Sequence, residues 1–238
     1  MTAGKYVLAI NGSPRKAEGV TDLVTRKFLE GAAAAGAETE TVYLSSLKMA
    51  DCLGDFDCWF KTPGKCRHKD DVPGVQEKMR RADVLVYATP LYICTMSALM
   101  KRFLDRICPM AEPYQCYENG VCSHPIREGE HMGRMVLISV AGFPGLRNFD
   151  ALRFTFERLA EVGGDELAGA ILFPASPLLM LQPNPAAEQL DYVVQAGREI
   201  LEGPISAETA AGYSKPYVDD EAYIAMMNEM FKNLVSAT

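Results

Sequence analysis

The chain has 238 residues, of which 48% are hydrophobic and 23% charged, a balance that suits one globular domain with a substantial core. Its formal net charge of -7 at pH 7 argues against a protein that binds nucleic acid through the phosphate backbone. No apolar stretch approaches the roughly 20 residues of a membrane helix, and the first expected strand begins by Lys5, which leaves no room for a signal peptide. We therefore expect a soluble, cytoplasmic protein with no membrane partner.

Short apolar runs alternate with segments of helical periodicity along the whole chain. The expected strands are residues 5–11, 39–44, 83–89, 133–141 and 167–175. Several of these runs are almost continuously apolar, as in strands that are buried on both faces of a parallel sheet. Five such strands with intervening helices predict an α/β fold, a three-layer, doubly wound five-stranded parallel sheet, which binds ligands at the carboxyl ends of its strands.

The first strand ends in the loop "NGSPRKAEGVT", residues 11–21. Ser13 and Thr21 offer hydroxyl groups, Arg15 offers positive charge, and the following helix begins with unpaired N–H groups. This combination is typical of an anion cradle, best suited to a phosphate, although neither the P-loop nor the GxGxxG pattern is present. A simple polar turn remains an equal alternative for this loop taken by itself.

The second strand is followed by a cysteine-rich segment, residues 52–72, that contains Cys52, Cys58 and Cys66. Three thiols in so short a segment could hold a soft metal or an iron–sulfur cluster, with Asp55 as a further ligand. The segment could equally be a structural loop or carry redox-active thiols, and we do not favour a cluster. The seven cysteines are an odd number and are better explained as free thiols or ligands than as a disulfide framework. The three histidines show no spacing typical of metal ligands, so we expect no separate metal site.

The third strand leads into "TPLYICTMS", residues 89–97, and then into a helix. Pro90 stiffens the turn, Tyr92 places an aromatic ring at the mouth of a site, and the free N–H groups before the helix could bind the edge of a flat heterocycle. A half-buried surface tyrosine is the plain alternative. The helix is predicted over residues 96–107 from its apolar spacing. Its polar face, expected to be solvated or to contact another subunit, consists of Lys101, Arg102, Asp105 and Arg106.

Residues 108–131 are too long and too polar for an ordinary connection, and we expect them to wall the ligand site together with a neighbouring subunit. After the fourth strand, "SVAGFPGLRNF" places Gly142 and Phe143 in a tight turn where the aromatic ring could cover a ligand. A turn closed only by core packing is the alternative for this third loop.

The sequence predicts three further helices in the last part of the chain. One helix is predicted around Leu152, Phe156 and Leu159, and another begins with Asn184 as its N-cap and Pro185 at its first position. The tail carries an apolar helical stripe that must pack on the domain or, as we favour, on another subunit. We therefore divide the chain into a domain over residues 1–205 and a C-terminal extension over residues 206–238. The stripe consists of Tyr223, Met226, Met227, Met230, Phe231 and Leu234.

Taken together, "GSPR" with Thr21, "TPLYICTMSALMKRFLDR" and "AGFPGLRNFDAL" resemble the flavodoxin-like NAD(P)H-dependent FMN reductase superfamily, in particular its branch of iron–sulfur flavoproteins and multimeric flavodoxins. The resemblance implies the strand order 2-1-3-4-5, FMN as cofactor and NAD(P)H as co-substrate. It assigns no catalytic residue. This chain departs from the family pattern in the first loop, which is about one residue longer than the usual "RxxGNT" and has Val20 where asparagine is usual. The residues that the resemblance assigns to the FMN phosphate are Ser13, Arg15 and Thr21, and those it assigns to the flavin ring are Pro90, Leu91, Tyr92, Met96, Gly142 and Phe143.

These features predict an oxidoreductase in which NAD(P)H delivers hydride to flavin N5 and a small-molecule acceptor, such as a quinone or a flavin, then takes the same place in a ping-pong scheme. The alternative is a flavin electron carrier, with or without an iron–sulfur cluster, that has no NAD(P)H activity of its own. A response-regulator receiver shares the topology, but the chain lacks an acidic cluster after the first strand. We expect a homodimer or homotetramer.

Overall fold

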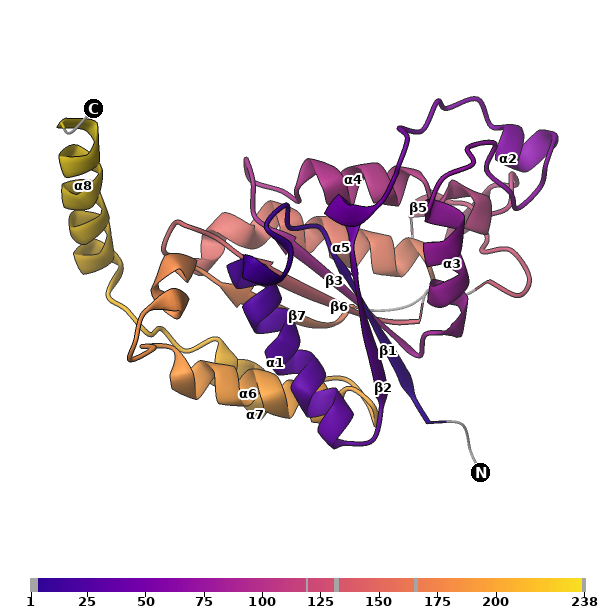
Figure 1. Ribbon diagram of the computed structural model, residues 1–238. Coiled ribbons are helices and arrows are strands. Elements are labelled where there is room, and N and C mark those ends of the chain that lie inside the picture. The colour runs from indigo at the N-terminus through magenta and orange to yellow at the C-terminus, as the bar shows by residue number, and fades with distance from the viewer. Residues whose placement is uncertain (1–3, 119, 131–132, 165–166, 237–238) are drawn as a thin grey trace.

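A central parallel sheet organises the molecule (Figure 1). The computed structural model describes residues 4–118, 120–130, 133–164 and 167–236. The five strands of the sheet are β1 (Tyr6–Asn11), β2 (Glu38–Tyr43), β3 (Val84–Pro90), β6 (Arg134–Val140) and β7 (Leu167–Phe173). They lie in the order β2-β1-β3-β6-β7 and are all parallel. The predicted fold class and strand order are therefore confirmed.

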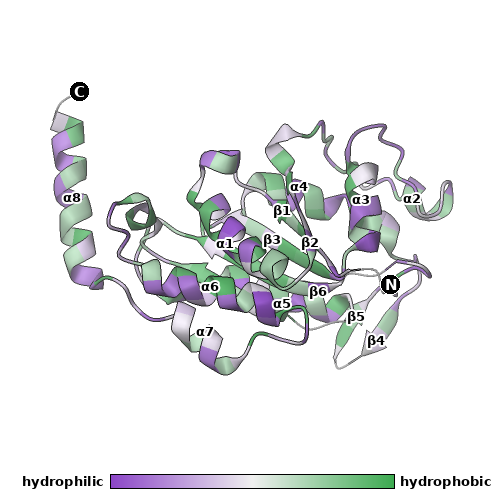
Figure 2. Ribbon diagram, turned by 60° about the horizontal axis from the view of Figure 1, so that its bottom comes forward, coloured by the Kyte–Doolittle hydropathy of each residue, from purple (hydrophilic) through white to green (hydrophobic). Residues whose placement is uncertain are grey.

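Helices cover both faces of the sheet. The helices on one face are α3 (Val72–Arg81), α4 (Ala98–Asp105) and α5 (Asp150–Val162), and those on the other are α1 (Val20–Ala34), α6 (Ala187–Glu199) and α7 (Ala207–Tyr213). Figure 2 shows apolar strands in the middle and hydrophilic patches on the outer sides of the helices. The central strands β1 and β3 are buried along their whole length because helices shield both of their faces, which explains their continuous apolar runs.

Two glycines allow α1 and α6 to pack backbone against backbone. A Cβ atom added at Gly31 would lie 1.8 Å from the carbonyl oxygen of Val194, and one added at Gly197 would lie 1.9 Å from that of Phe28. No side chain fits in these gaps, because real Cβ contacts are well above 3 Å. The contact holds α1 firmly, and α1 carries the first loop of the predicted site at its N-terminus.

Several short elements lie outside the central sheet and the six helices that cover it. They are the helix α2 (Asp57–Phe60), the hairpin β4 (Cys116–Glu118) with β5 (Val121–Ser123), and the 3-10 helices η1 (Lys16–Glu18), η2 (Leu44–Ser46), η3 (Cys108–Met110), η4 (Leu146–Phe149) and η5 (Ser176–Met180). None of the helices in the described ranges has both the length and the apolarity that crossing a membrane requires.

The long insertion, as far as the structure describes it, does not wall the predicted ligand site of its own chain. Its described part packs around Trp59 and against the last turn of α5, where Leu159, Val162 and Gly163 line a shared hollow with Ile126. Both α4 and α5 start at the carboxyl edge of the sheet, so their C-terminal ends lie at the opposite, amino edge. For the site of its own chain the expectation was wrong, because apolar residues such as Ile126 dock the segment onto the core despite its polar composition.

Two helices begin a few residues later in the structure than the sequence predicts. The helix expected from Met96 begins at Ala98, with Ser97 as its N-cap, because the Ser97 hydroxyl accepts the N–H of Met100. Asn184 is not the N-cap of α6, which begins after Ala186. The Asn184 side chain instead accepts the N–H of Ala186, 2.9 Å away, and so forms a turn ahead of the helix.

The C-terminal helix α8 (Asp220–Ser236) projects away from the rest of the molecule, as Figure 1 shows. Only Tyr223 of its predicted apolar stripe is buried. Met226, Met230 and Leu234, which follow one another at helical spacing, are exposed. The stripe therefore packs on its own domain through Tyr223 and Met227, in the first two turns of α8.

Candidate functional site

The first loop wraps tightly upon itself between β1 and α1. The Ser13 hydroxyl accepts the N–H of Arg15 at 3.3 Å, and the Ser13 side chain is almost fully buried. A Cβ atom at Gly19, the N-cap of α1, would lie 2.9 Å from the Ser13 hydroxyl oxygen. The loop therefore encloses a small cradle beside the N-terminus of α1, with Arg15 exposed at its rim.

A buried polar network supports this loop from below. Asn11 accepts the N–H of Ser13 at 2.8 Å, and its amide donates to the buried carboxylate of Asp22. Asp22 also accepts hydrogen bonds from Tyr43 and Arg26, each 2.8 Å long. Because every link is a side chain on a strand or helix, the network fixes the cradle to the rigid framework.

The second loop contains a tight turn of unusual backbone geometry. Tyr92 and Thr95 pair with each other through two backbone hydrogen bonds, and the residues between them, Ile93 and Cys94, have φ angles of 45° and 67°. Left-handed conformation is strained for a β-branched residue such as isoleucine and is concentrated at functional sites. Among the described residues, the N–H groups of Ile93, Cys94 and Met96 have no hydrogen-bond partner.

Ser97 joins the second loop to the first. Its hydroxyl donates to the carbonyl oxygen of Gly12 at 2.7 Å, and its N–H donates to the Thr89 hydroxyl at 3.0 Å. The Ser139 hydroxyl on β6 donates to the carbonyl oxygen of Thr89 at 2.8 Å. Sequence reasoning missed these three hydroxyl residues, although a serine directly before a helix is a recognisable N-cap signal.

The third loop is held between β7 and the C-terminal helix. Ala175 donates its N–H to the carbonyl oxygen of Phe143, and the Tyr223 hydroxyl donates to that of Gly142 at 2.6 Å. The ring of Phe143 is 72% exposed. A hollow of about 720 Å³ opens between this loop and α8, lined by Phe143, Tyr223, Met227 and Phe231 among others.

The predicted site residues all lie at the carboxyl edge of the sheet, but they are not equally accessible. Arg15, Tyr92, Gly142 and Phe143 are exposed, whereas Pro90 and Met96 are buried. Met96 packs into the core, so only its backbone faces the loop region as a free group. Ser13 and Thr21 are also buried, and Leu91 is half-buried. The exposed groups come from all three loops.

Four cysteines meet in a second place, a pocket between α2 and the C-terminal end of α4. Cys52, Cys58 and Cys66 line it together with Cys108, which comes from the other side of α4 along the chain. The thiols of Cys58 and Cys108 hydrogen-bond each other. Sequence reasoning missed Cys108 because no spacing rule connects it to the segment of the other three. In the described part of the chain, no three potential ligands lie at the spacing that a single metal ion requires.

Burial makes two of these thiols, those of Cys58 and Cys108, less acidic. It raises the pKa of Cys108 to about 12, and the neighbouring Cys58 adds to the rise. Burial also raises the pKa of Cys58. Both groups are therefore protonated at neutral pH unless a bound cation displaces their protons.

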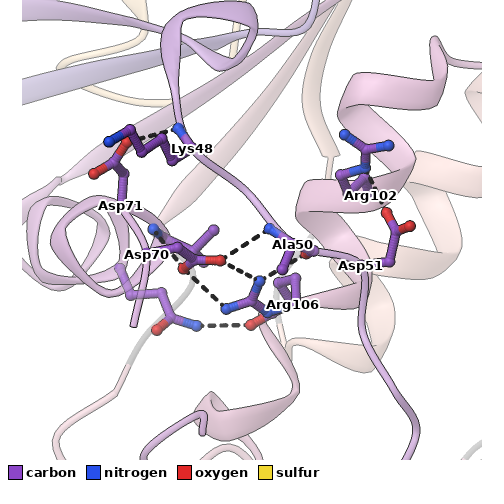
Figure 3. A network of polar contacts seen from close by, with 9 residues as sticks. Lys48, Ala50, Asp51, Asp70, Asp71, Arg102 and Arg106 are labelled. Carbon is purple, nitrogen blue, oxygen red and sulfur yellow. Dashed lines mark hydrogen bonds and ion pairs between the residues drawn. The ribbon is translucent and has the colours of Figure 1, made fainter. Parts of the chain in front are cut away.

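Arg106 closes the floor of the cysteine pocket. It was expected on a solvated or subunit-contacting face, but its side chain is 0% exposed. As Figure 3 shows, its guanidinium donates to both carboxylate oxygens of Asp70, at 2.7 and 3.1 Å, and to the carbonyl oxygen of Ala50 at 2.7 Å. The prediction failed because Asp70 belongs to the cysteine-rich segment, which reaches α4 only in the folded chain.

The Asp70–Arg106 pair is ionised in the folded protein. Burial alone would raise the pKa of Asp70, but the hydrogen bonds from Arg106 and from the Ala50 N–H hold it below its ordinary value. Burial alone would likewise lower the pKa of Arg106, but Asp70 and the neighbouring Cys66 raise it. A fixed positive charge therefore lies against the cysteine pocket.

Comparisons with known proteins agree with this architecture. The profile of a family described as NADPH-dependent FMN reductase matches residues 6–142, more than half of the chain. An iron–sulfur flavoprotein of Methanocaldococcus jannaschii is 38% identical over 109 residues, which cover 46% of this chain and 55% of that protein. The chain spans about half the length of the curated relatives it matches.

Solved structures share the fold at low sequence identity. An FMN-dependent NADH-azoreductase of Bacillus anthracis, in complex with FMN, superposes with a TM-score of 0.58 at 15% identity, covering 82% of this chain and 97% of that one. An NAD(P)H:quinone oxidoreductase of Methanothermobacter marburgensis gives a TM-score of 0.59 at 18% identity, with 84% and 98% covered. At these identities the similarity concerns the fold.

Proposed function

The chain belongs to the NADPH-dependent FMN reductase family, and from this premise we propose that it is an FMN-dependent oxidoreductase that takes hydride from NAD(P)H and passes the electrons to a small-molecule acceptor. The observation that carries the proposal is the joining of three loops at the carboxyl edge of the sheet. Ser97 ties the first loop to the second, and the Leu91 N–H donates to the carbonyl oxygen of Val140 at the start of the third.

The first loop fits the phosphate of FMN. A Cβ atom at Gly19 would lie only 2.9 Å from the Ser13 hydroxyl oxygen, so glycine is what lets the loop close onto the N-terminus of α1. Helix N-termini favour anions through their free N–H groups and the helix dipole. Ser13 and Thr21 would contribute from the floor of the cradle and Arg15 from its rim.

The second and third loops fit the flavin ring. The unpaired N–H groups of Ile93, Cys94 and Met96 would bind the polar edge of the ring, while Tyr92 and Phe143 would flank its faces. The strained turn at Ile93 presents these N–H groups without any rearrangement on binding. Bound FMN would supply the redox chemistry, and the protein would bind and orient it.

The hollow beside the third loop is our candidate for the position that the substrates occupy in turn. It is lined by Phe143 of the third loop and by apolar residues of α8, among them Tyr223 and Met227. Such a surface suits a flat, apolar acceptor such as a quinone or a flavin. Because NAD(P)H and the acceptor share one place, product must leave before the acceptor enters, which gives ping-pong kinetics.

We extend the proposal to a second cofactor and to self-association. Relatives of 30–38% identity are named iron–sulfur flavoproteins, and the four-cysteine pocket of this chain has the donors that iron in such a cluster prefers. The exposed apolar face of α8, formed by Met226, Met230 and Leu234, suits contact with a second copy in a homodimer or homotetramer.

Anaerobic titration tests the proposed function. The protein saturated with FMN should be bleached by NADPH or NADH alone, and initial-velocity plots with a quinone acceptor should be parallel. An Arg15→Ala variant should bind FMN more weakly, while a Lys27→Ala variant, altered on an exposed part of α1, should not. Bleaching that requires an added reductase would instead identify an electron carrier, and intersecting plots would exclude the shared position.

A further inference from the structure

Four of the seven cysteines line one pocket, although they come from distant parts of the chain. Cys52, Cys58 and Cys66 belong to the segment around α2, and Cys108 begins η3 beyond α4. We propose that these four cysteines are the complete thiolate ligand set of an iron–sulfur cluster, with Cys108 as the fourth ligand.

The contacts of Asp55 make it a weaker candidate for the fourth ligand than Cys108. One of its carboxylate oxygens accepts a hydrogen bond from Arg67 at 3.0 Å, and the other accepts the N–H of Asp57 at 3.2 Å. Both oxygens are therefore already engaged within the segment. Thiolate is also the better match to the iron of a sulfide cluster.

The arrangement favours a cluster over a single ion such as zinc. A structural zinc site needs four ligands about 2.3 Å from one point, so all its sulfurs lie close together. Only the Cys58 and Cys108 thiols hydrogen-bond each other, and no three of the described potential ligands reach single-ion spacing. Ligands of a cluster are distributed over more than one iron atom, so they need not all lie around a single point.

Two residues that line the pocket each carry a buried nitrogen atom without a hydrogen-bond partner in the part of the chain that the structure describes. The Nε atom of Arg106 and the Nε2 atom of His68 have no hydrogen-bond partner among the described residues, and both residues line the pocket. A buried unpaired donor such as the Arg106 Nε–H is costly, and cluster sulfur atoms accept hydrogen bonds from such groups. The charge of Arg106, fixed by Asp70, would also offset the negative charge of four thiolates.

Aromatic residues cover the pocket on its outer side. The rings of Phe56 and Trp59 stack with their centroids 5.1 Å apart, and the indole N–H of Trp59 donates to the carbonyl oxygen of Cys108 at 3.2 Å. This bond fixes η3 to α2, so it holds Cys108 beside the other three cysteines.

The pocket lies one short helix away from the predicted flavin. The eight residues of α4 join the second flavin loop to the region of Cys108, a length of about 12 Å. When bound, such a cluster takes up and returns one electron at a time. The inference adds to the proposed function but is tested separately from it, because FMN content and NADPH oxidation have their own readouts.

The ligand set is tested by metal content. The full chain is purified anaerobically, reconstituted with ferrous iron and sulfide, and analysed for iron, acid-labile sulfide, zinc, FMN and its electron paramagnetic resonance spectrum after reduction. Cys108→Ser should lose at least about half of the iron and sulfide and change the spectrum, with FMN content unchanged. Asp55→Ala and the control Cys122→Ser, on the exposed hairpin, should match the unaltered protein.

A second measurement needs no variant. Alkylation of the reconstituted protein should leave Cys52, Cys58, Cys66 and Cys108 unmodified, and removal of iron by a chelator should expose all four together. Full iron and an unchanged spectrum in Cys108→Ser, loss of iron in Asp55→Ala, zinc in place of iron, or alkylation of Cys108 in the iron-loaded protein would each overturn the proposal. Loss of NADPH oxidation alone would bear only on the proposed reductase activity.

Discussion

Replacing Ser97 by alanine would remove one buried hydroxyl that serves two of the three site loops. The change deletes the N-cap of α4, which costs about 1 kcal/mol, and leaves the buried carbonyl oxygen of Gly12 without its 2.7 Å donor, which costs about 1–3 kcal/mol more. We therefore expect Ser97→Ala to lower the free energy of unfolding by about 2–4 kcal/mol. Ser206 is the matched control, since it caps α7 in the same way but is exposed and far from the site, and Ser206→Ala should cost only about 1 kcal/mol.

The two variants should differ in ligand binding as well as in stability. Without the Ser97 bridge the first two loops are no longer held at a fixed separation, so the Kd for FMN should rise about tenfold, equivalent to about 1.4 kcal/mol, while Ser206→Ala should leave it unchanged. Urea unfolding measures the stability, and quenching of flavin fluorescence measures the Kd. Equal stability losses in both variants, with an unaltered Kd in Ser97→Ala, would refute the role of Ser97 as the joint between the loops.

Three further predictions concern the framework around the site. Asp70→Asn should lower the free energy of unfolding by about 3–5 kcal/mol at pH 7, because it leaves the buried charge of Arg106 unpaired. Since the folded pKa of Asp70 is depressed, this loss should be full above pH about 3.9 and should shrink as the pH falls through the lower folded pKa. Urea unfolding across this pH range measures the change. Gly197→Ala should lower the free energy of unfolding by more than about 3 kcal/mol, because its Cβ would meet a backbone carbonyl of α1. Gly74→Ala, exposed in α3 with open space around it, should raise the free energy of unfolding by about 0.5–1 kcal/mol. Similar melting temperatures for the two variants would contradict this contrast. Met230→Glu should weaken self-association at least tenfold in sedimentation experiments, and an unchanged mass would show that the exposed face of α8 is not the contact.

The sheet could be predicted from the sequence because its signal is local. Runs such as Val84–Pro90 are apolar throughout, and this pattern has one common explanation, a strand buried on both faces. The three site loops follow from the same reasoning, because parallel strands bring their carboxyl ends to one edge. The FMN-binding residues predicted within these loops remain a prediction.

The features that escaped prediction depend on contacts between distant segments. Cys108 is separated from the other pocket cysteines by β3 and α4, so only the fold brings it to them. Arg106 looked like a surface residue because its partner Asp70 lies on a different element. The insertion was placed at the wrong edge because composition does not reveal where a few apolar residues such as Ile126 will dock. Tertiary packing decides each of these cases.

The projecting helix α8 has a chemical consequence. Met226 and Met230 are 48% and 43% exposed, and oxidation would turn each apolar thioether into a polar sulfoxide. In the homo-oligomer that we propose, oxidation would therefore make the contact surface of α8 polar and weaken the association of the chains. Sulfoxide reductases would then govern how quickly the proposed contact re-forms.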